Sequence, residues 1–383
     1  MTPPKSKVLH ISTTSAGGLG TSLLSIMLAL DPQRFQVEVA LGLGYPLDSA
    51  FEPAGIRLHP LRLTRGIHPL QFIETVIRLT RLIRRERYDV VHVHGSEAGI
   101  LARIAARVAG VPVVIAELHG YANRNPDSLL ERTVYRWIEQ ALDRVTDAYV
   151  AVSGHVERQW IARGICSGDR VQVIHHALDL KDFPDRGEIT RPGRTTGHPT
   201  VGTVCLLEAR KGLHSLVEAM PAVVQAVPGV RFAIVGEGPL REWMAERAAE
   251  LGVLQHIDFM GWRKDVPELM WQFDLFALPS RRESFGLVFL EAMASRCPLV
   301  GSRVDGIPEV VSDGQTGTLV APDDPPALAA AIVDLLCDAD KARRFAEAGR
   351  LRVETLFSAE RMAQEYNALY LRLLDNAGQR RPR

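Results

Sequence analysis

The hydrophobic positions of this chain fall into short apolar runs that alternate with longer stretches of helical spacing. The first run, Val-Leu-His-Ile within residues 7–12, is followed by a glycine-rich turn and then by Leu, Ile and Met at helical spacing. The same order recurs as far as residue 174 and begins again at residue 200. Short apolar strands separated by helices are typical of a parallel sheet with both faces covered. The pattern therefore predicts an α/β protein.

Two sets of strands can be placed from this pattern. Strands are expected in the first half at residues 7–12, 36–42, 89–94, 112–116, 147–152 and 171–174, and in the second at 200–205, 231–235, 257–260, 275–278 and 299–301. Helices are expected at 69–87, 98–109, 212–227, 326–338, 340–357 and 359–374, with a loop-rich segment at 304–320. Residues 181–199 contain three prolines and three glycines and are interpreted as a linker. The predicted architecture is two Rossmann-like doubly wound domains facing a cleft, residues 1–180 and 200–358.

The composition narrows the class of protein. Of 383 residues, 46% are hydrophobic and 23% charged, as in globular proteins, and Lys and Arg equal Asp and Glu at 45 each. The chain therefore has no net positive charge that would favour binding to nucleic acid. No apolar run approaches the roughly 20 residues of a membrane span and no signal peptide is recognisable, so we expect a cytoplasmic protein. The cysteines form no CxxC pair and are expected to be buried thiols: Cys166, Cys205, Cys297 and Cys337.

One region departs from the overall charge balance. Residues 54–110 contain ten Arg against four acidic residues, and the arginines from Arg78 to Arg87 alternate with apolar positions of one predicted helix. A basic amphipathic helix can lie on an anionic lipid surface, which predicts a peripheral position at the inner face of the cell membrane. The alternative is a helix buried on one side whose arginines are solvated.

The stretch 283–298 carries the most informative arrangement of chemistry. An apolar strand ends at Pro279, a turn from Glu283 to Gly286 follows, and a helix is expected from Val288 to Ser295. This order directs a helix N-terminus, with its unpaired amides and partial positive charge, beyond the strand end. Two carboxylates, Glu283 and Glu291, flank those amides and can accept sugar hydroxyls. The alternative is a Glu that favours a helix N-terminus and a Ser that caps it.

Three other turns follow predicted strand ends. Gly17 and Gly18 allow a close backbone approach to a phosphate or sugar, although the full G-x-G-x-x-G fingerprint is absent. Arg210-Lys211 lies at a helix entry, where two cations suit a diphosphate. The third turn is Gly236-Glu237-Gly238. Packing glycines, a solvated loop and a plain turn are the respective alternatives.

Histidines cluster at strand ends in the first half of the chain: His92, His94, His119, His175 and His176. We favour His119 as a functional residue because it precedes Gly120-Tyr121 in a loop expected to face the cleft. Their spacing matches no Cys-containing structural zinc site, and HExxH is absent. Asp338-Ala-Asp340 is interpreted as a helix boundary rather than a metal-binding DxD. No divalent metal is expected.

With these pieces placed, nearly the whole chain resembles the GT-B-fold retaining glycosyltransferases of family 4, the glycosyl transferases group 1. The most specific match is Glu283-x7-Glu291, supported by Gly236-Glu-Gly-Pro-Leu240, by Gly306-Ile-Pro-Glu-Val-Val311, and by the first-half segments His94 to Arg103 and His119-Gly120. The first-half segments are similar to those of polysaccharide-type members.

The resemblance implies a retaining enzyme that takes a sugar from a UDP- or GDP-sugar without a metal and passes it to a hydroxyl of a glycan or lipid-linked acceptor. It implies that Glu283, Glu291 and Lys211 hold the sugar, the ribose and the phosphates, and that His119 contacts the transferred sugar or acceptor. It also implies that helix 359–376 crosses back onto the first domain. The wider donor set is Gly17, Gly18, Arg210, Gly236, Glu237, Gly238, Ser284, Phe285, Gly286 and Leu287, and the acceptor side is His94, His119 and Tyr121.

The chain departs from the family pattern at two places. Leu206 stands where relatives often carry a phosphate-binding Arg, and Arg210 is the candidate replacement. His175-His-Ala-Leu-Asp179 replaces the usual Pro-Asn-Gly-x-Asp. Two alternatives therefore stay open: a nucleotide-sugar epimerase of similar fold, and a non-catalytic protein that binds sugar nucleotides.

Overall fold

The computed structural model describes residues 5–14, 17–42, 50–61, 69–120, 129–184 and 198–380. Contacts between residues divide the chain into two compact units. Unit 1 comprises Met1–His176 together with Ala359–Arg383, and unit 2 comprises Ala177–Ser358. The division falls four residues before the expected domain end at 180, and most of the expected linker lies outside the described residues.

Unit 1 is built on a seven-stranded sheet in which every pairing is parallel. The order reverses between β1 and β4, and at such a switch point the loops on either side diverge from the carboxyl edge of the sheet. In spatial order the strands are β3 (Arg57–Leu61), β2 (Phe35–Gly42), β1 (Ser6–Ser12), β4 (Val90–His94), β5 (Val113–Leu118), β6 (Ala148–Ala151) and β7 (Val171–Val173).

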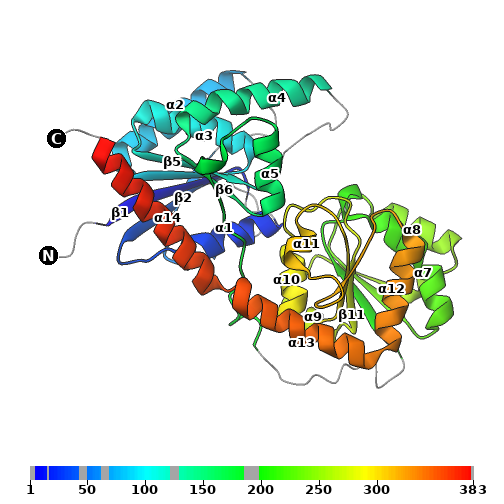
Figure 1. Ribbon diagram of the computed structural model, residues 1–383. Helices are drawn as coiled ribbons and strands as arrows, with labels where there is room; N and C mark the ends of the chain where they lie inside the picture. Colours follow the sequence, from blue (N-terminus) through cyan, green and yellow to red (C-terminus); the bar gives the residue numbers. More distant parts are fainter. Residues whose placement is uncertain are drawn as a thin grey trace. The chain divides into compact units, whose positions relative to one another are not determined.

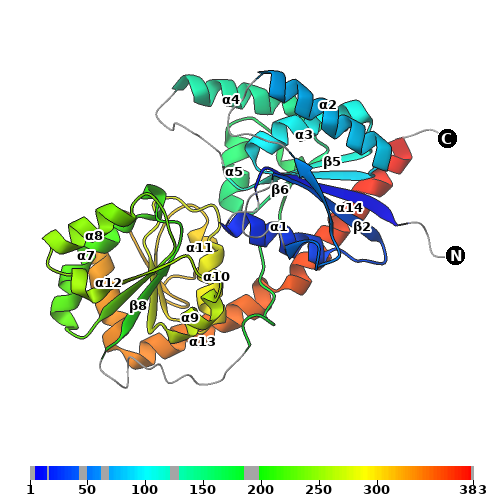
Figure 2. The same cartoon turned by 180° about the vertical axis from the view of Figure 1, so that it is seen from behind.

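Helices cover both faces of this sheet, which explains why β4 and β5 are buried along their whole length. Figures 1 and 2 show α2 (Pro69–Glu86), α3 (Ser96–Ala109) and α4 (Leu129–Leu142) over one face, and α1 (Gly17–Ala29) and α14 (Ala359–Arg380) over the other. The remaining helix is α5 (Gly154–Ala162). The last helix of the chain thus belongs to unit 1, as expected, and it extends beyond the expected end at 376.

Unit 2 repeats the design with a six-stranded parallel sheet. Its order is β10 (Ile257–Gly261), β9 (Arg231–Val235), β8 (Thr200–Val204), β11 (Leu275–Leu278), β12 (Leu299–Ser302) and β13 (Thr318–Val320). One face carries α7 (Leu213–Ala226), α8 (Arg241–Glu250) and α12 (Pro325–Cys337); the other carries α9 (Val266–Gln272), α10 (Leu287–Ala294), α11 (Ile307–Val310) and α13 (Ala339–Leu356) (Figure 2). The predicted α/β architecture with two parallel sheets is confirmed.

Several elements lie where the sequence pattern placed none. The expected loop-rich segment 304–320 contains α11 and β13, which are too short to show a period. Strand β3 was missed because it contains Pro60 and alternates weakly, both of which an edge strand tolerates. Asp338 marks a helix boundary as predicted: its carboxylate accepts a hydrogen bond from the Lys341 amide at 2.9 Å and caps α13. The four cysteines are free thiols; Cys166 and Cys297 are buried as expected, whereas Cys205 is partly buried and Cys337 is exposed.

Candidate functional site

The loops at the carboxyl edge of the unit 2 sheet pack backbone against backbone at glycines. A Cβ at Gly212, which has φ +66°, would lie 1.8 Å from the carbonyl oxygen of Pro279. A Cβ at Gly236 would lie 1.9 Å from the Cys205 oxygen. These approaches are possible only without a side chain, and they join the loops after β8, β9 and β11 into one surface. The structure therefore brings together three of the predicted turns.

The most informative contact on this surface joins two residues predicted to bind the donor. The Lys211 ammonium donates a hydrogen bond to Oε2 of Glu283, and the two side chains are only 11% and 12% exposed. Lys211 ends a 3₁₀ turn after β8, and Glu283 lies in the loop after β11. The Arg210 carbonyl accepts a hydrogen bond from the Arg281 amide at 2.8 Å, which fixes the two loops together. These contacts fix the position of a cation next to a carboxylate.

A third loop, which follows β12, forms hydrogen bonds with the main chain of Glu283. Its amide donates to Oδ2 of Asp305 at 3.0 Å, and its carbonyl accepts from the Gly306 amide at 3.0 Å. A Cβ at Gly306 would lie 2.1 Å from the Ser284 oxygen, so the loop after β12 also approaches as bare backbone. Glu283 is therefore fixed at its main chain while its carboxylate faces Lys211.

Helix α10 begins directly after this loop. Gly286, with φ 98°, is its N-cap residue and has no side chain with which to cap the helix. A helix N-terminus of this kind directs backbone amides and a partial positive charge toward an anion. Glu291 lies on the second turn, partly buried, and burial raises its pKa to about 7.

The remaining predicted residues of unit 2 are more exposed. Arg210 forms an ion pair with Glu208 and is 49% exposed, so its guanidinium is accessible near Lys211. Leu206, at the position of the missing Arg, is 54% exposed. The Leu207 amide donates to the Glu237 carbonyl at 2.9 Å, which fixes the turn of Gly236 and Gly238 against the loop after β8.

In unit 1 the predicted residues separate into different environments. Gly17 and Gly18 are the first residues of α1. His94 ends β4 and is completely buried, whereas His119 follows β5 and its side chain is 20% exposed. Of these two predicted acceptor-side residues, only His119 is accessible to solvent. Tyr121 lies outside the described residues.

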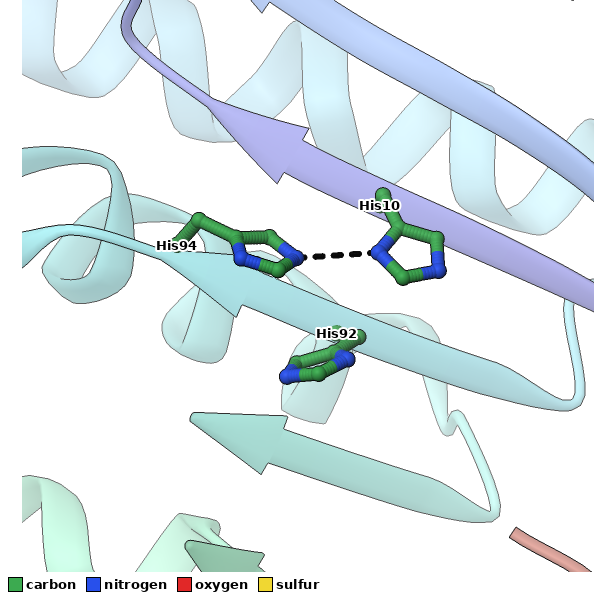
Figure 3. A group of neighbouring side chains, drawn as sticks. All are labelled: His10, His92 and His94. Carbon is green, nitrogen blue, oxygen red and sulfur yellow. Dashed lines mark hydrogen bonds between the residues drawn. The ribbon is translucent and has the colours of Figure 1, made fainter. Parts of the chain in front are cut away.

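Strand register gathers the histidines on one face of the unit 1 sheet. His10 of β1 pairs with His92 of β4, and His94 pairs with Glu117 of β5. Alternate residues of a strand share a face, so His92, His94, Glu117 and His119 lie together. His10 Nδ1 and His94 Nε2 form a hydrogen bond of 2.9 Å (Figure 3). The sequence analysis missed Glu117; the spacings His-x-His and Glu-x-His were its only signal.

Helix α14 covers this group with two buried tyrosines. The Tyr366 hydroxyl donates to Oε2 of Glu117 at 3.1 Å, and the Tyr370 hydroxyl hydrogen bonds to Nδ1 of His92 at 2.6 Å. Burial raises the pKa of Glu117 to about 6. Burial also lowers the pKa of each surrounding imidazole, so that the rings are neutral at pH 7: His10, His92, His94, His119 and His176.

Two parallel-sheet α/β units, with loops gathered at the carboxyl edge of each sheet, define the GT-B class of glycosyltransferases. Comparison with protein families agrees with this class. Residues 17–177 match the glycosyl transferase 4-like domain, and residues 198–338 match the glycosyl transferases group 1 model.

Individual proteins that resemble the chain in sequence or structure agree with these family matches. It is 32% identical to a glycogen synthase of Mycobacterium tuberculosis over 81% of this chain and 76% of that protein. It is 26% identical to a UDP-Gal:alpha-D-GlcNAc-diphosphoundecaprenol alpha-1,3-galactosyltransferase of Escherichia coli, over 83% and 85% of the two chains. Among solved structures, HepE of Anabaena, in complex with UDP and glucose, superposes with a TM-score of 0.82 at 22% identity, over 96% of this chain and 100% of that one. The chain belongs to the glycosyl transferases group 1 family and is a glycosyltransferase of family 4 type.

Proposed function

We propose that this glycosyltransferase takes a sugar from a nucleotide-diphosphate sugar and transfers it, with retention at the anomeric carbon, to a hydroxyl of a glycan or lipid-linked acceptor. The observation that carries the proposal is the Lys211–Glu283 pair, which lies in the loops next to the N-terminus of α10. A cation, a helix N-terminus and a carboxylate in one place match the three chemical parts of such a donor: diphosphate, its developing charge and sugar hydroxyls.

The donor is assigned first to the UDP-sugars. The Escherichia coli relative is named for UDP-Gal, and the HepE structure contains UDP. GDP-sugars are the alternative, because no described residue of this site distinguishes the two bases. Lys211, Arg210 and the amides of Phe285 to Leu287 are assigned to the diphosphate, Glu283 to the sugar and Glu291 to the ribose. The turn Gly236 to Gly238 is assigned to the same ligand, and Gly17 and Gly18 of unit 1 remain predicted donor-binding residues.

The proposed transfer breaks the bond between the anomeric carbon and the phosphate oxygen, and forms a bond from that carbon to the acceptor oxygen on the same face. The acceptor proton passes to the departing phosphate oxygen, which needs no dedicated side-chain base. Lys211 and the α10 amides stabilise the charge that develops on the diphosphate, and they do so without a metal in the donor site. Glu283 positions the sugar and does not act as a nucleophile.

The acceptor is assigned to lipid-linked or free glycans. The Escherichia coli relative is named for a diphosphoundecaprenol-linked acceptor, which supports a lipid-linked substrate here. His119 is the described residue of unit 1 best placed to contact it, because its ring is partly exposed at the end of β5.

A membrane surface is proposed as a further partner of unit 1. Helix α2 exposes Ile73 and Ile77 beside Arg78 and Arg81, and α4, over the same face of the sheet, exposes Trp137. Arginines interleaved with exposed apolar side chains suit an anionic lipid surface. Among the described residues, no helix is both long enough and apolar enough to cross a bilayer.

The test removes both charges of the key pair at once. Replacing one partner leaves the other buried and unpaired, which destabilises the fold by itself. The double variant Lys211→Met/Glu283→Gln keeps the side-chain volumes, so we expect it to fold. It should lose about 100-fold or more in kcat/KM and should lose the thermal stabilisation by nucleotide.

The matched control is Lys341→Met/Asp334→Asn, which neutralises a more exposed pair of unit 2 joined at 2.7 Å. It should transfer at the wild-type rate.

The donor is first chosen by thermal-shift screening of UDP, GDP, ADP and their sugar conjugates. Product NMR then reads the anomeric configuration, and turnover in EDTA tests metal independence. Wild-type transfer by the Lys211/Glu283 double variant would overturn the assignment.

A further inference from the structure

Four buried side-chain atoms on one face of the unit 1 sheet have no hydrogen-bond partner among the described residues. They are Nε2 of His92, Nδ1 of His94, Oε1 of Glu117 and Nε2 of His119. Each buried polar atom left unpaired costs about 1–3 kcal/mol. Four of them in one cluster, contributed by two adjacent strands, indicate a shared partner.

The distances within the cluster suit metal coordination better than hydrogen bonding. Oε2 of Glu117 lies 3.3 Å from His92 Nε2 and 3.4 Å from His94 Nδ1, and Oε1 of Glu117 lies 3.6 Å from His119 Nε2. Ligand atoms at the corners of a tetrahedral zinc site are about 3.3–3.4 Å apart, since each bond is about 2.0–2.1 Å. The ligand atoms of His94, Glu117 and His119 all lie within 4.8 Å of one another.

The side chains of this cluster are already oriented by hydrogen bonds. Nδ1 of His92 hydrogen bonds to Tyr370 at 2.6 Å, and Nε2 of His94 to His10 at 2.9 Å (Figure 3). Oε2 of Glu117, which faces His92 and His94, also accepts a hydrogen bond from Tyr366 at 3.1 Å. Partners of this kind orient the ligands of metal sites, because each one fixes the tautomer and the direction of the ring or carboxylate.

The types of side chain in the cluster also suit a metal ion. Among the described residues, no Lys or Arg forms an ion pair with Glu117, and its neighbours at ion-pair distance are the imidazoles of His92, His94 and His119. Imidazole with one carboxylate is a ligand set that zinc accepts.

We propose that His94, Glu117 and His119 bind one Zn²⁺ in unit 1. The ion would tie the ends of β4 and β5 together and, through Tyr366, to α14. This departs from the expectation of no metal, which rested on sequence patterns in which cysteines or HExxH supply the ligands. The site lies in unit 1, so it is independent of the proposed donor chemistry of unit 2. With Nε2 on the ion, His119 retains Nδ1 for a substrate.

Metal content is the direct test. Protein from zinc-supplemented cells, desalted after a brief EDTA wash, should contain close to one zinc per chain by elemental analysis. His119→Ala should lose most of this zinc, because His119 lies past the strand end and can be removed with the least damage to the core; circular dichroism verifies its fold. His256→Ala, a histidine of unit 2, should retain it.

A second measurement uses the wild-type chain alone. After removal of zinc with a strong chelator, the melting temperature should fall, and added Co²⁺ should restore it and produce the visible absorption of a tetrahedral site. Wild-type protein with less than about one zinc per ten chains and no Co²⁺ absorption would overturn the proposal. Equal zinc in wild type and a folded His119→Ala would also overturn it, as an adventitious ion only.

Discussion

Glu291 illustrates how burial alone sets the charge of a single residue. Its carboxyl lies on the second turn of α10, and burial raises its pKa to about 7 from an ordinary value near 4.5. It is therefore largely protonated in the unliganded protein below pH 7. Sugar or ribose hydroxyls that donate to the carboxylate would favour its charged form.

A raised carboxyl pKa makes stability depend on pH. Between pH 4.5 and 7 the unfolded chain releases the Glu291 proton while the folded chain keeps it, so the free energy of unfolding should fall as pH rises through this window. The upper limit is about 3 kcal/mol, because each pKa unit corresponds to about 1.4 kcal/mol. Urea unfolding at pH 5 and pH 8 measures it. In Glu291→Gln this part of the pH dependence should vanish; an unchanged slope would contradict the assignment.

At the scale of elements, the candidate donor site depends on loops that meet without side chains. Gly212 begins α7 in the left-handed region and approaches the Pro279 carbonyl so closely that a Cβ would lie 1.8 Å from it. The loop positions of Lys211 and Glu283 follow from this approach, since each residue lies within a few positions of the contact. The site is therefore a product of backbone packing as much as of charged side chains.

Gly212→Ala should destabilise the protein by about 2–4 kcal/mol, through the strain of a positive φ and through displacement of the loop. Gly252→Ala is the matched control, because Gly252 has φ +69° with nothing within 4 Å of an added Cβ. It should cost about 1 kcal/mol or less and leave nucleotide binding unchanged. Equal losses in the two variants, measured by urea unfolding, would show that the loop contact contributes nothing.

Helix α2 carries the prediction of membrane contact. Leu79 and Ile83 are buried against the unit, while Ile73, Ile77 and the arginines face solvent. The helix therefore satisfies the alternative of one-sided burial and still presents an exposed face of mixed apolar and basic character. Both interpretations from sequence describe part of the same helix.

Vesicles containing anionic lipid should bind the protein at low salt and release it at high salt, because about 1 kcal/mol per Arg comes from the surface potential. Replacing Arg78, Arg81, Arg84 and Arg85 by Gln should abolish sedimentation with the vesicles. Replacing four exposed basic residues of unit 2 removes the same charge and should leave binding intact: Arg263, Lys264, Arg343 and Arg344. Equal loss in both variants would assign the binding to net charge alone.

At the scale of the whole molecule, two units repeat one architecture and differ in what they gather at the sheet. Unit 2 collects a cation, a carboxylate and a helix N-terminus at the carboxyl edge. Unit 1 collects buried histidines and a glutamate on one face, beneath α14. The proposed donor chemistry uses the residues gathered in unit 2, and the proposed acceptor contact uses His119 of unit 1.

The sequence by itself determined the alternation of strands and helices, and with it two parallel sheets, because periodicity is local and survives in any tertiary setting. It also placed Lys211 and Glu283 at strand ends, where ligands of α/β proteins bind. Only the tertiary structure decided that these two residues, 72 positions apart, form an ion pair. It alone placed Glu117 among the histidines and Tyr366 against Glu117, because strand register and helix docking depend on contacts between distant segments.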